Sequence, residues 1–315
     1  MQNSQRQRSY PYRKTGSVLI ICLWTLVFFS ILSAGLYSIV GSQLNMARAL
    51  EERCASRYMA KAASCYAIAE RQNSKKTYDT LFGLMTKRST DMGRGKFVYA
   101  LSDEEGKINI STADKEMLER LPGLGSTSAD AILEYRLKKE SHTFDLVEEL
   151  LFVDGISGSV YNECKNYVTV YSNSKVNINT APVEVLYALG FERQLAENVR
   201  EYRQGADGEE GTIDDGFFEN ADEIPEKLNS FRSLSEPQVA ELQSVISRDR
   251  VSVLSEALQV FIETSILDRP STKYAVIIVT EKPEVIKAPG GVEGSEDEGT
   301  IDAKGQIKIK KWTEY

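Results

Sequence analysis

The sequence has 315 residues, of which 42% are hydrophobic and 27% charged, and its formal net charge is −8. This length and apolar content exclude a disordered chain and favour two folded units with an additional segment. With one histidine, His142, and four cysteines that form no CxxC pair, histidine-based catalysis and structural zinc sites are disfavoured. A pI near 5.1 disfavours sequence-independent nucleic-acid binding, because phosphate neutralisation requires clustered Lys and Arg. The composition therefore favours a protein that is not an enzyme.

The amino-terminal region predicts a membrane anchor. Residues 1–16 carry four cations and no acid, and residues 18–40 form a run of 23 residues without a charge. As a helix this run spans about 34 Å, enough to cross a bilayer core of about 30 Å. The basic flank precedes the run, so we expect a cytoplasmic amino end. A cleaved secretory signal is the alternative, but its apolar region is usually about 7 to 15 residues long.

Helix-forming residues continue the apolar run over residues 42–72. No proline occurs between Pro11 and Pro122, so a single helix over residues 17–72 is expected. Its outer half carries one apolar stripe at three- and four-residue spacing, made of Ala47, Leu50, Cys54, Tyr58, Ala62, Cys65 and Ile68. A plain stalk is the simpler alternative to a helix that packs under a folded head.

A basic leader that ends in glycine, followed at once by an apolar helix, resembles the type IV prepilins and pseudopilins. The resemblance implies that prepilin peptidase cleaves after Gly16 and leaves Ser17 as an N-methylated amino terminus, where the family usually has an aromatic residue or Met. The fifth mature residue is usually Glu, which is costly in lipid unless it pairs with the amine of the subunit ahead. Here that residue is Ile21. A subunit at the filament tip has no subunit ahead of it and does not need this acid. A chain with Ile21 at this position therefore resembles the K-type minor pseudopilin of type II secretion.

An internal repeat occupies the middle of the chain. Residues 107–113 read KINISTA and residues 175–181 read KVNINTA, 68 positions later. The similarity continues to ADAILEYR, which ends at Arg136, and to AENVREYR, which ends at Arg203. We expect two packed helical units, residues 106–174 and 175–250, in one domain. The Asn-x-Ser/Asn-Thr-Ala pattern is predicted to cap the helix that follows it.

The first copy resembles a helix-hairpin-helix motif, as found in DNA-binding proteins. Residues 118–136 predict a helix, a Pro-Gly turn and a second helix, and the resemblance implies that amides of the turn at 122–125 can hold a phosphate. Residues 106–250, however, contain 15 Lys and Arg against 27 Asp and Glu, a difference of −12 that repels phosphate. The second copy reads LGFERQ at the turn and lacks the Gly-x-Gly element. We therefore favour structural or protein-binding use.

The second copy also carries seven extra residues within 204–216, QGADGEEGTIDDG. Hard oxygen ligands on a glycine-containing loop suit Ca²⁺, although a solvated acidic loop is the alternative. K-type pseudopilins bind calcium in their helical domain, so the resemblance implies calcium as a cofactor here. The expected ligands come from Asp207, Glu209, Glu210, Asp214, Asp215 and Asp222, with Glu223 close in sequence.

Strand-like segments lie on both sides of the repeats. Residues 96–101, 258–266, 273–281 and 306–315 are rich in β-branched and aromatic residues and predict an antiparallel sheet, with the outer half of the long helix covering its apolar face. The expected fold is α+β and pilin-like, with a long N-terminal transmembrane helix on an antiparallel sheet and a large inserted all-α domain of two helix-hairpin-helix-like repeats. Its predicted parts are a leader (1–16), the long helix (17–72), the first part of the head (73–105), the insertion (106–250) and the last strands (251–315).

The resemblance implies a non-catalytic component of the type II secretion pseudopilus tip. The chain would be a single-pass protein of the bacterial inner membrane with a periplasmic head, and its charge after cleavage would be −12. Implied partners are I- and J-type minor pseudopilins, the major pseudopilin, prepilin peptidase and the inner-membrane assembly platform, with no nucleic acid. The main alternative is a membrane-anchored helix-hairpin-helix DNA receptor of the competence type, and an anchored hydrolase is a more distant one.

The remaining candidates for chemistry are isolated. His142 lies in a polar turn and is expected to be solvated. Cys54 and Cys65 are eleven residues apart on one helix, about 16 Å along its axis, so they cannot bond to each other. Either could pair with Cys164 in an oxidising compartment. Buried free thiols are the simpler interpretation.

Overall fold

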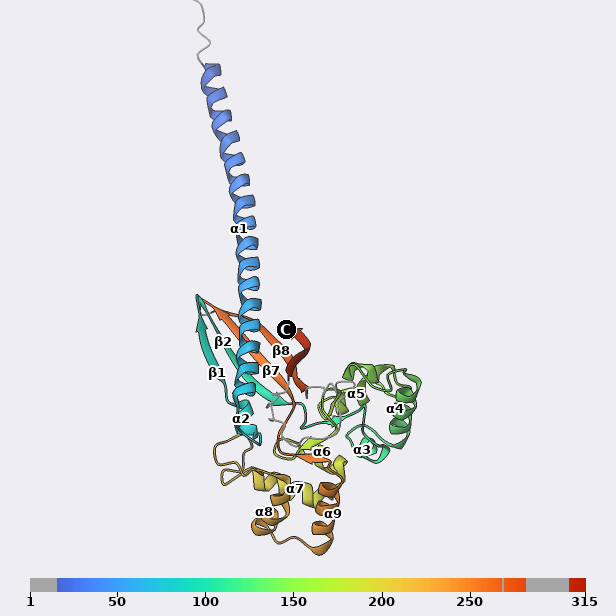
Figure 1. Cartoon of the computed structure of the whole chain (residues 1–315). Coiled ribbons are helices and arrows are strands. Elements are labelled where there is room, and N and C mark those ends of the chain that lie inside the picture. Colours follow the sequence, from blue (N-terminus) through green and yellow to red (C-terminus); the bar gives the residue numbers. More distant parts are fainter. Residues whose placement is uncertain (1–15, 268, 282–305) are drawn as a thin grey trace, which may run out of the picture. The chain divides into compact units, whose positions relative to one another are not determined.

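The computed structural model describes residues 16–267, 269–281 and 306–315. The chain divides into two compact units, residues 1–55 and 56–315, and each is described by itself. The first unit consists, as far as it is described, of the first part of helix α1 (Gly16–Asn73). At 58 residues this helix confirms the single long helix expected from the absence of proline (Figure 1). It is long and apolar enough to cross a membrane.

The second unit contains a five-stranded antiparallel sheet in the order β1-β2-β7-β8-β9 (Figure 1). The four predicted strands are present, and β1 is an additional one. The sequence of β1, RSTDM, has no alternation of apolar and polar residues, and the strand forms because the turn at Gly93 (φ 62°) folds it back on β2. The strands are β1 (Arg88–Met92), β2 (Gly95–Asp103), β7 (Ala257–Ile266), β8 (Arg269–Glu281) and β9 (Gln306–Glu314).

The part of α1 that belongs to the second unit covers one face of this sheet, as expected. Ala60, Ala63 and Ala67 are fully buried and belong to the same core as Phe97 of β2 and Val260 of β7. Their small side chains let the helix backbone approach the sheet closely. A buried hydroxyl cluster reinforces the contact. There the Oγ of Ser56 lies 2.7 Å from Thr264 Oγ1 and 3.0 Å from Tyr274 Oη. A short helix, α2 (Leu81–Met85), follows and is capped by Thr80.

Helical segments lie in the sequence between β2 and β7, which are neighbours in the sheet. The chain therefore leaves the sheet after Asp103 and returns at Ala257 to pair beside the strand it left. The first copy runs through β3 (Ile108–Asn109), α3 (Lys115–Glu119), α4 (Ser126–Lys138), η1 (Val147–Phe152), α5 (Gly158–Cys164) and β4 (Val168–Thr169). The second runs through β5 (Val176–Asn177), α6 (Val183–Leu189), α7 (Arg193–Arg203), η2 (Ala221–Glu223), α8 (Ile224–Phe231), α9 (Glu236–Ser247) and β6 (Val251–Ser252).

Each copy is closed by a short parallel strand pair. Strand β3 pairs with β4, and β5 pairs with β6, so the pairing of the second copy extends to Ser252. The buried apolar residues of both copies form one continuous core. The two copies therefore share a single hydrophobic interior.

The predicted helix cap is wrong. The amide of Met117 bonds to the side chain of Asp114, which caps α3, and Pro182 stands at the cap of α6 without a side-chain bond. The asparagines instead form turns, because the Oδ1 of Asn109 and of Asn177 each accepts from the amide two residues later, at 2.8 and 3.0 Å. A local side-chain bond to the backbone thus replaces the cap.

Candidate functional site

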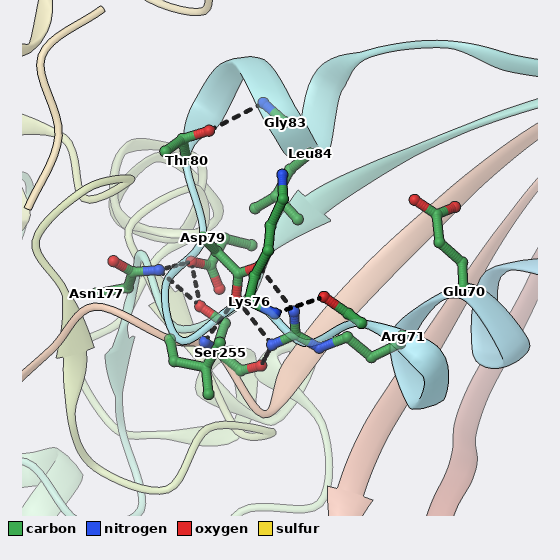
Figure 2. A network of polar contacts seen from close by, with 12 residues as sticks. Glu70, Arg71, Lys76, Asp79, Thr80, Gly83, Leu84, Asn177 and Ser255 are labelled. Carbon is green, nitrogen blue, oxygen red and sulfur yellow. Dashed lines mark hydrogen bonds and ion pairs between the residues drawn. The ribbon is translucent and has the colours of Figure 1, made fainter. Parts of the chain in front are cut away.

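The junction between the sheet and the helical copies is the most polar buried region of the second unit. Strand β2 ends in Asp103, followed by Glu104 and Glu105, and all three side chains are buried. Figure 2 shows Asn177 beside Ser255, which in turn contacts Asp79 and Arg71 at this point. Residues from the end of α1, from the second copy and from the segment before β7 are therefore held together by polar contacts.

Arg71 and Asp79 form an ion pair at the junction. The two guanidinium nitrogens of Arg71 donate to the two carboxylate oxygens of Asp79, at 2.7 and 2.8 Å (Figure 2). Arg71 also donates to the carbonyl oxygen of Ser255, whose amide donates to Asp79 over 2.9 Å. This bidentate geometry fixes the end of α1 against the segment that precedes β7.

Asp103 accepts four hydrogen bonds. Its Oδ2 accepts from Asn177 at 2.9 Å, Thr180 at 2.6 Å and Ser255 at 2.5 Å. Its Oδ1 accepts a hydrogen bond from the amide of Glu105 at 2.7 Å. Burial raises the pKa of Asp103 to about 6, although these hydrogen bonds oppose the shift. The carboxylate thus organises the exit of the chain from the sheet.

Glu105 is buried beside Asp103. Its side chain is 0% exposed, and neither carboxyl oxygen has a hydrogen-bond partner among the described residues. Burial, with the Asp103 charge as the next cause, raises the pKa of Glu105 to about 8. Glu105 is therefore protonated at neutral pH. Neighbouring Glu104, in contrast, pairs with Lys107 at 2.7 Å and accepts a hydrogen bond from Thr169 at 2.7 Å.

The first hairpin joins α3 to α4 and has the Gly-x-Gly turn. Gly123 has a φ of 74°, and a Cβ there would lie 2.8 Å from the Cβ of Glu163 and 3.0 Å from its Oε2. This close approach requires glycine. It also places a carboxylate beside the turn whose amides would hold a phosphate. Gly125, the N-cap of α4, is exposed.

The second hairpin joins α6 to α7, and a carboxylate fills its amide site. The amide of Glu192, the N-cap of α7, donates to the Oε1 of Glu241 over 2.6 Å. Gly190 ends α6 with a φ of 127°. A free amide at a helix start is a binding place for anions, and here it is already occupied by the protein's own side chain.

Cations of the two helical copies are mostly held by acids of these copies. Such pairs leave little charge to attract phosphate. They include Lys115 with Asp130, Lys139 with Glu149, Lys175 with Asp249, Arg203 with Glu210 and Arg250 with Asp114.

Five of the six predicted calcium ligands lie in the loop after α7, where Asp207, Asp214 and Asp215 accept hydrogen bonds from the loop itself, and Asp222 lies in η2. Asp214 accepts from Thr212 and Ala206, which lowers the pKa of its carboxyl to about 2. Asp215 accepts from the amide of Gly211 at 2.7 Å. Glu210 pairs with Arg203, and Asp207 accepts from the amide of Glu209 at 2.8 Å.

As arranged, the carboxylates of this loop do not converge. Among the described residues no group of three or more His, Cys, Asp or Glu side chains could hold a metal ion. Glu209 and Asp222 are exposed. A cation would have to displace the amide and hydroxyl donors of the loop, so calcium binding stays a prediction.

The other predicted residues lie apart from the junction. Gly16 is the first residue of α1, and residues 1–15 of the leader lie outside the described chain. All four cysteines are free, so no disulfide joins Cys164 to Cys54 or Cys65. Cys164 is buried, as its thiol was expected to be, and burial raises its pKa to about 11. Cys54 and Cys65 are exposed, which corrects the expectation that they are buried. His142 is exposed in its turn.

Comparisons with known proteins match different parts of the chain. Residues 103–169 match the model of the helix-hairpin-helix motif. The chain is 30% identical over 82 residues to ComE operon protein 1 of Bacillus subtilis (strain 168), which covers 26% of this chain and 39% of that protein. It is 30% identical over 146 residues to endonuclease/exonuclease/phosphatase family domain-containing protein 1 of Danio rerio, covering 37% and 26%. The chain thus spans less than half the length of either curated relative.

A solved structure is similar over a larger part of the chain. One chain of the GspK-GspI-GspJ complex from the type 2 secretion system of enterotoxigenic Escherichia coli aligns with a TM-score of 0.52. The alignment covers 85% of this chain and 99% of that one, at 14% identity. At this identity the likeness concerns the fold alone. The chain has a pseudopilin-like fold that contains a helix-hairpin-helix motif.

Sequence reasoning missed several residues of the junction and the hairpins. Glu163 and Glu241 are single acids on helices, and nothing in the sequence connects them to a turn far away. Asp103 and Glu105 had a signal, because the run Asp-Glu-Glu directly follows an apolar strand. Such a run is usually a solvated turn, and its burial depends on the helical copies packing over it.

Proposed function

We propose that this protein is a minor pseudopilin, a non-catalytic component at the tip of a type II secretion pseudopilus. The observation that carries the proposal is the pseudopilin-like fold over 85% of the chain, continuous with a helix apolar and long enough to span a membrane. Ile21 in place of the usual acid supports the tip position, because no subunit ahead of it needs to be paired. The helical copies distinguish this chain from a bare pilin head and support the K-type.

The proposed role assigns the parts of the chain to contacts. The apolar helix anchors the protein in the inner membrane with a cytoplasmic amino end and a periplasmic head, as its basic flank indicates. The head and anchor contact I- and J-type minor pseudopilins, the major pseudopilin and the assembly platform. The helical copies, whose amide and charge sites are largely satisfied internally, present a protein-binding surface.

Cleavage by prepilin peptidase tests this proposal. The full chain is co-expressed with the peptidase, and the intact mass of the membrane-bound product is measured. We expect a loss equal to residues 1–16 and a further methyl group on Ser17. A Gly16→Leu variant is the control and should keep its full mass. Loss of everything through residue 40 would show an ordinary secreted protein, and no cleavage at all would contradict the assignment.

Calcium binding by the loop after α7 is a separate proposal, which rests on its acids and on the pseudopilin-like fold. Thermal melting of the full chain in detergent is compared in EDTA and in millimolar CaCl₂, with MgCl₂ as the control. If calcium replaces the internal donors, the melting temperature rises by about 2 to 4 °C for each kcal/mol of stabilisation. The double change Asp214→Asn and Asp215→Asn should abolish the rise. Equal melting in EDTA and calcium would exclude the site.

The second candidate function is a membrane-anchored helix-hairpin-helix DNA receptor. It is favoured by the motif match over residues 103–169 and by the likeness to ComE operon protein 1. The contacts of the hairpins disfavour it, because Glu163 stands beside the first turn and Glu241 occupies the second. Mobility shifts of duplex DNA with the full chain distinguish the two. Tight binding that weakens steeply with salt would favour the receptor, and we expect none at physiological salt.

A further inference from the structure

An open pocket of about 530 Å³ lies along α8, on the second helical copy. It is separate from the junction and from both hairpins. Its lining combines two aromatic rings with charged groups, and the set is Tyr202, Glu223, Glu226, Lys227, Ser230 and Phe231. We call it the α8 pocket.

The two rings of the α8 pocket are held in different ways. Tyr202 stacks on buried Phe218 with ring centroids 4.9 Å apart, so the core fixes its position. Phe231 meets Tyr202 edge to face at 5.7 Å and remains 47% exposed. An exposed aromatic ring on a rigid support is a surface that attracts cations, because the ring face carries partial negative charge.

The cation that lines this pocket, Lys227, and the one beside it, Arg232, are already held by acids and rings. Lys227 pairs with Glu223 over 2.7 Å and lies 5.9 Å above the ring of Phe217. Arg232 pairs with Glu201 over 2.6 Å and lies 5.9 Å from the ring centre of Phe231. The region therefore binds cations twice with an acid and an aromatic ring, using its own residues.

One acid of the pocket, Glu226, is not used in these pairs. Glu226 is exposed, and its carboxylate forms no hydrogen bond or ion pair with the residues that the structure describes. Residues 217–232 contain four acids, Glu219, Asp222, Glu223 and Glu226, against the two cations Lys227 and Arg232. An apolar or acidic occupant would cover Glu226 without a partner, which is costly, whereas a cationic one would pair with it.

We propose that the α8 pocket docks an arginine or lysine side chain of a partner protein, between the ring of Phe231 and the carboxylate of Glu226. A planar guanidinium suits the site best, because it can stack on the ring while it donates to the carboxylate. The inference goes beyond the proposed function, since it needs only the described pocket and holds whether or not the chain caps a pseudopilus.

A tryptophan reporter tests the proposal on the full chain in detergent micelles. Phe231→Trp keeps an aromatic wall, and its emission is followed during titration with N-acetyl-arginine methylamide. The unaltered chain gives the background of Trp24 and Trp312. We expect a saturable change, with the neutral isostere N-acetyl-citrulline methylamide binding at least about fivefold more weakly. Equal responses to the two probes would overturn the proposal.

Two further variants make the test specific. Phe152→Trp is the matched control, because Phe152 is 75% exposed on the first copy and does not line the pocket, so it should not distinguish the probes. In the reporter chain, Glu226→Gln should weaken arginine binding about two- to fivefold. An equal arginine preference at residue 152, an unchanged affinity in Glu226→Gln, or tighter binding of N-acetyl-leucine methylamide would each contradict it. Circular dichroism confirms that each variant is folded.

Discussion

The two helical copies make the same internal contacts but differ where their hairpins meet solvent. In each copy an arginine near the end of the second helix donates to carbonyl groups of the opening turn. Arg136 bonds to Ser111 and Ala113, and Arg203 bonds to Ile178 and Ala181. In each copy a tyrosine also stacks on the phenylalanine that follows, with centroids 5.4 and 4.9 Å apart. The repeated letters thus encode a packing arrangement.

The hairpins themselves have diverged. The first keeps its glycines and an exposed helix start, and the second has an acid bound to the amide where its helix begins. The copies therefore show that a helix-hairpin-helix motif specifies how helices pack, while the residues around its turn decide whether an anion can bind. A motif match alone does not assign a ligand.

The largest difference between the copies is expected at the arginines. Arg203 is 1% exposed, so Arg203→Ala leaves two buried carbonyls and Glu210 without their donor and should cost about 3 to 5 kcal/mol. Arg136 is only partly buried and pairs with no acid among the residues that the structure describes, so Arg136→Ala should cost about 1 to 2 kcal/mol. Chemical unfolding of the full chain in detergent measures both. Equal losses would show that the copies are energetically equivalent.

The residues that precede the two copies differ in how they make the stability of the fold depend on pH. Glu105 precedes the first copy where Asn173 precedes the second. Because the folded pKa of Glu105, about 8, lies above its ordinary value of 4.5, the folded state binds more protons between these values, and stability falls as pH rises through them. Below the lower value this contribution is complete, and above the higher value it is lost.

Glu105→Gln isolates this effect. The variant replaces the ionisable carboxyl with a neutral amide of similar shape. Its stability should therefore exceed that of the unaltered chain by an amount that increases with pH. The difference should grow by about 2 kcal/mol between about pH 6 and 8. Asn173→Asp is the comparison at the second copy, where the side chain is exposed, and should show no such slope. Parallel pH profiles of Glu105→Gln and the unaltered chain would refute the buried protonated carboxyl.

Much of the fold could be predicted from the sequence, because its signals are local. The uncharged run and the absence of proline predicted α1, and β-branched alternation predicted β2, β7, β8 and β9. The repeat predicted two helical copies and the hairpin of α3 and α4. Strand β1 lacked a local signal, since RSTDM pairs only because the turn at Gly93 brings it beside β2.

The site was less predictable, because its partners are distant in sequence. Asp103 is 74 residues from Asn177 and 152 from Ser255, so three of its four hydrogen bonds exist only after the sheet and the second copy have packed together. The cap predicted for the Asn-x-x-Thr-Ala turns failed for the opposite reason. Each asparagine could accept a hydrogen bond from the amide two residues later, which is closer in sequence than the amides of the following helix.

The smallest effect is expected at the acids of the hairpins. Glu241→Ala frees the amide of Glu192 and should cost about 1 kcal/mol, as the loss of a helix cap does. Glu163→Ala, at an exposed residue whose carboxylate accepts no hydrogen bond from the first turn, should change stability by less than about 0.5 kcal/mol. Sulfate can occupy the freed amide, so it should restore part of the melting temperature in Glu241→Ala beyond its effect on the unaltered chain. If sulfate raises the melting temperature of Glu163→Ala instead, the anion site is the first hairpin. In that case the contact of Glu241 with the second hairpin does not explain the weak affinity for DNA that we expect.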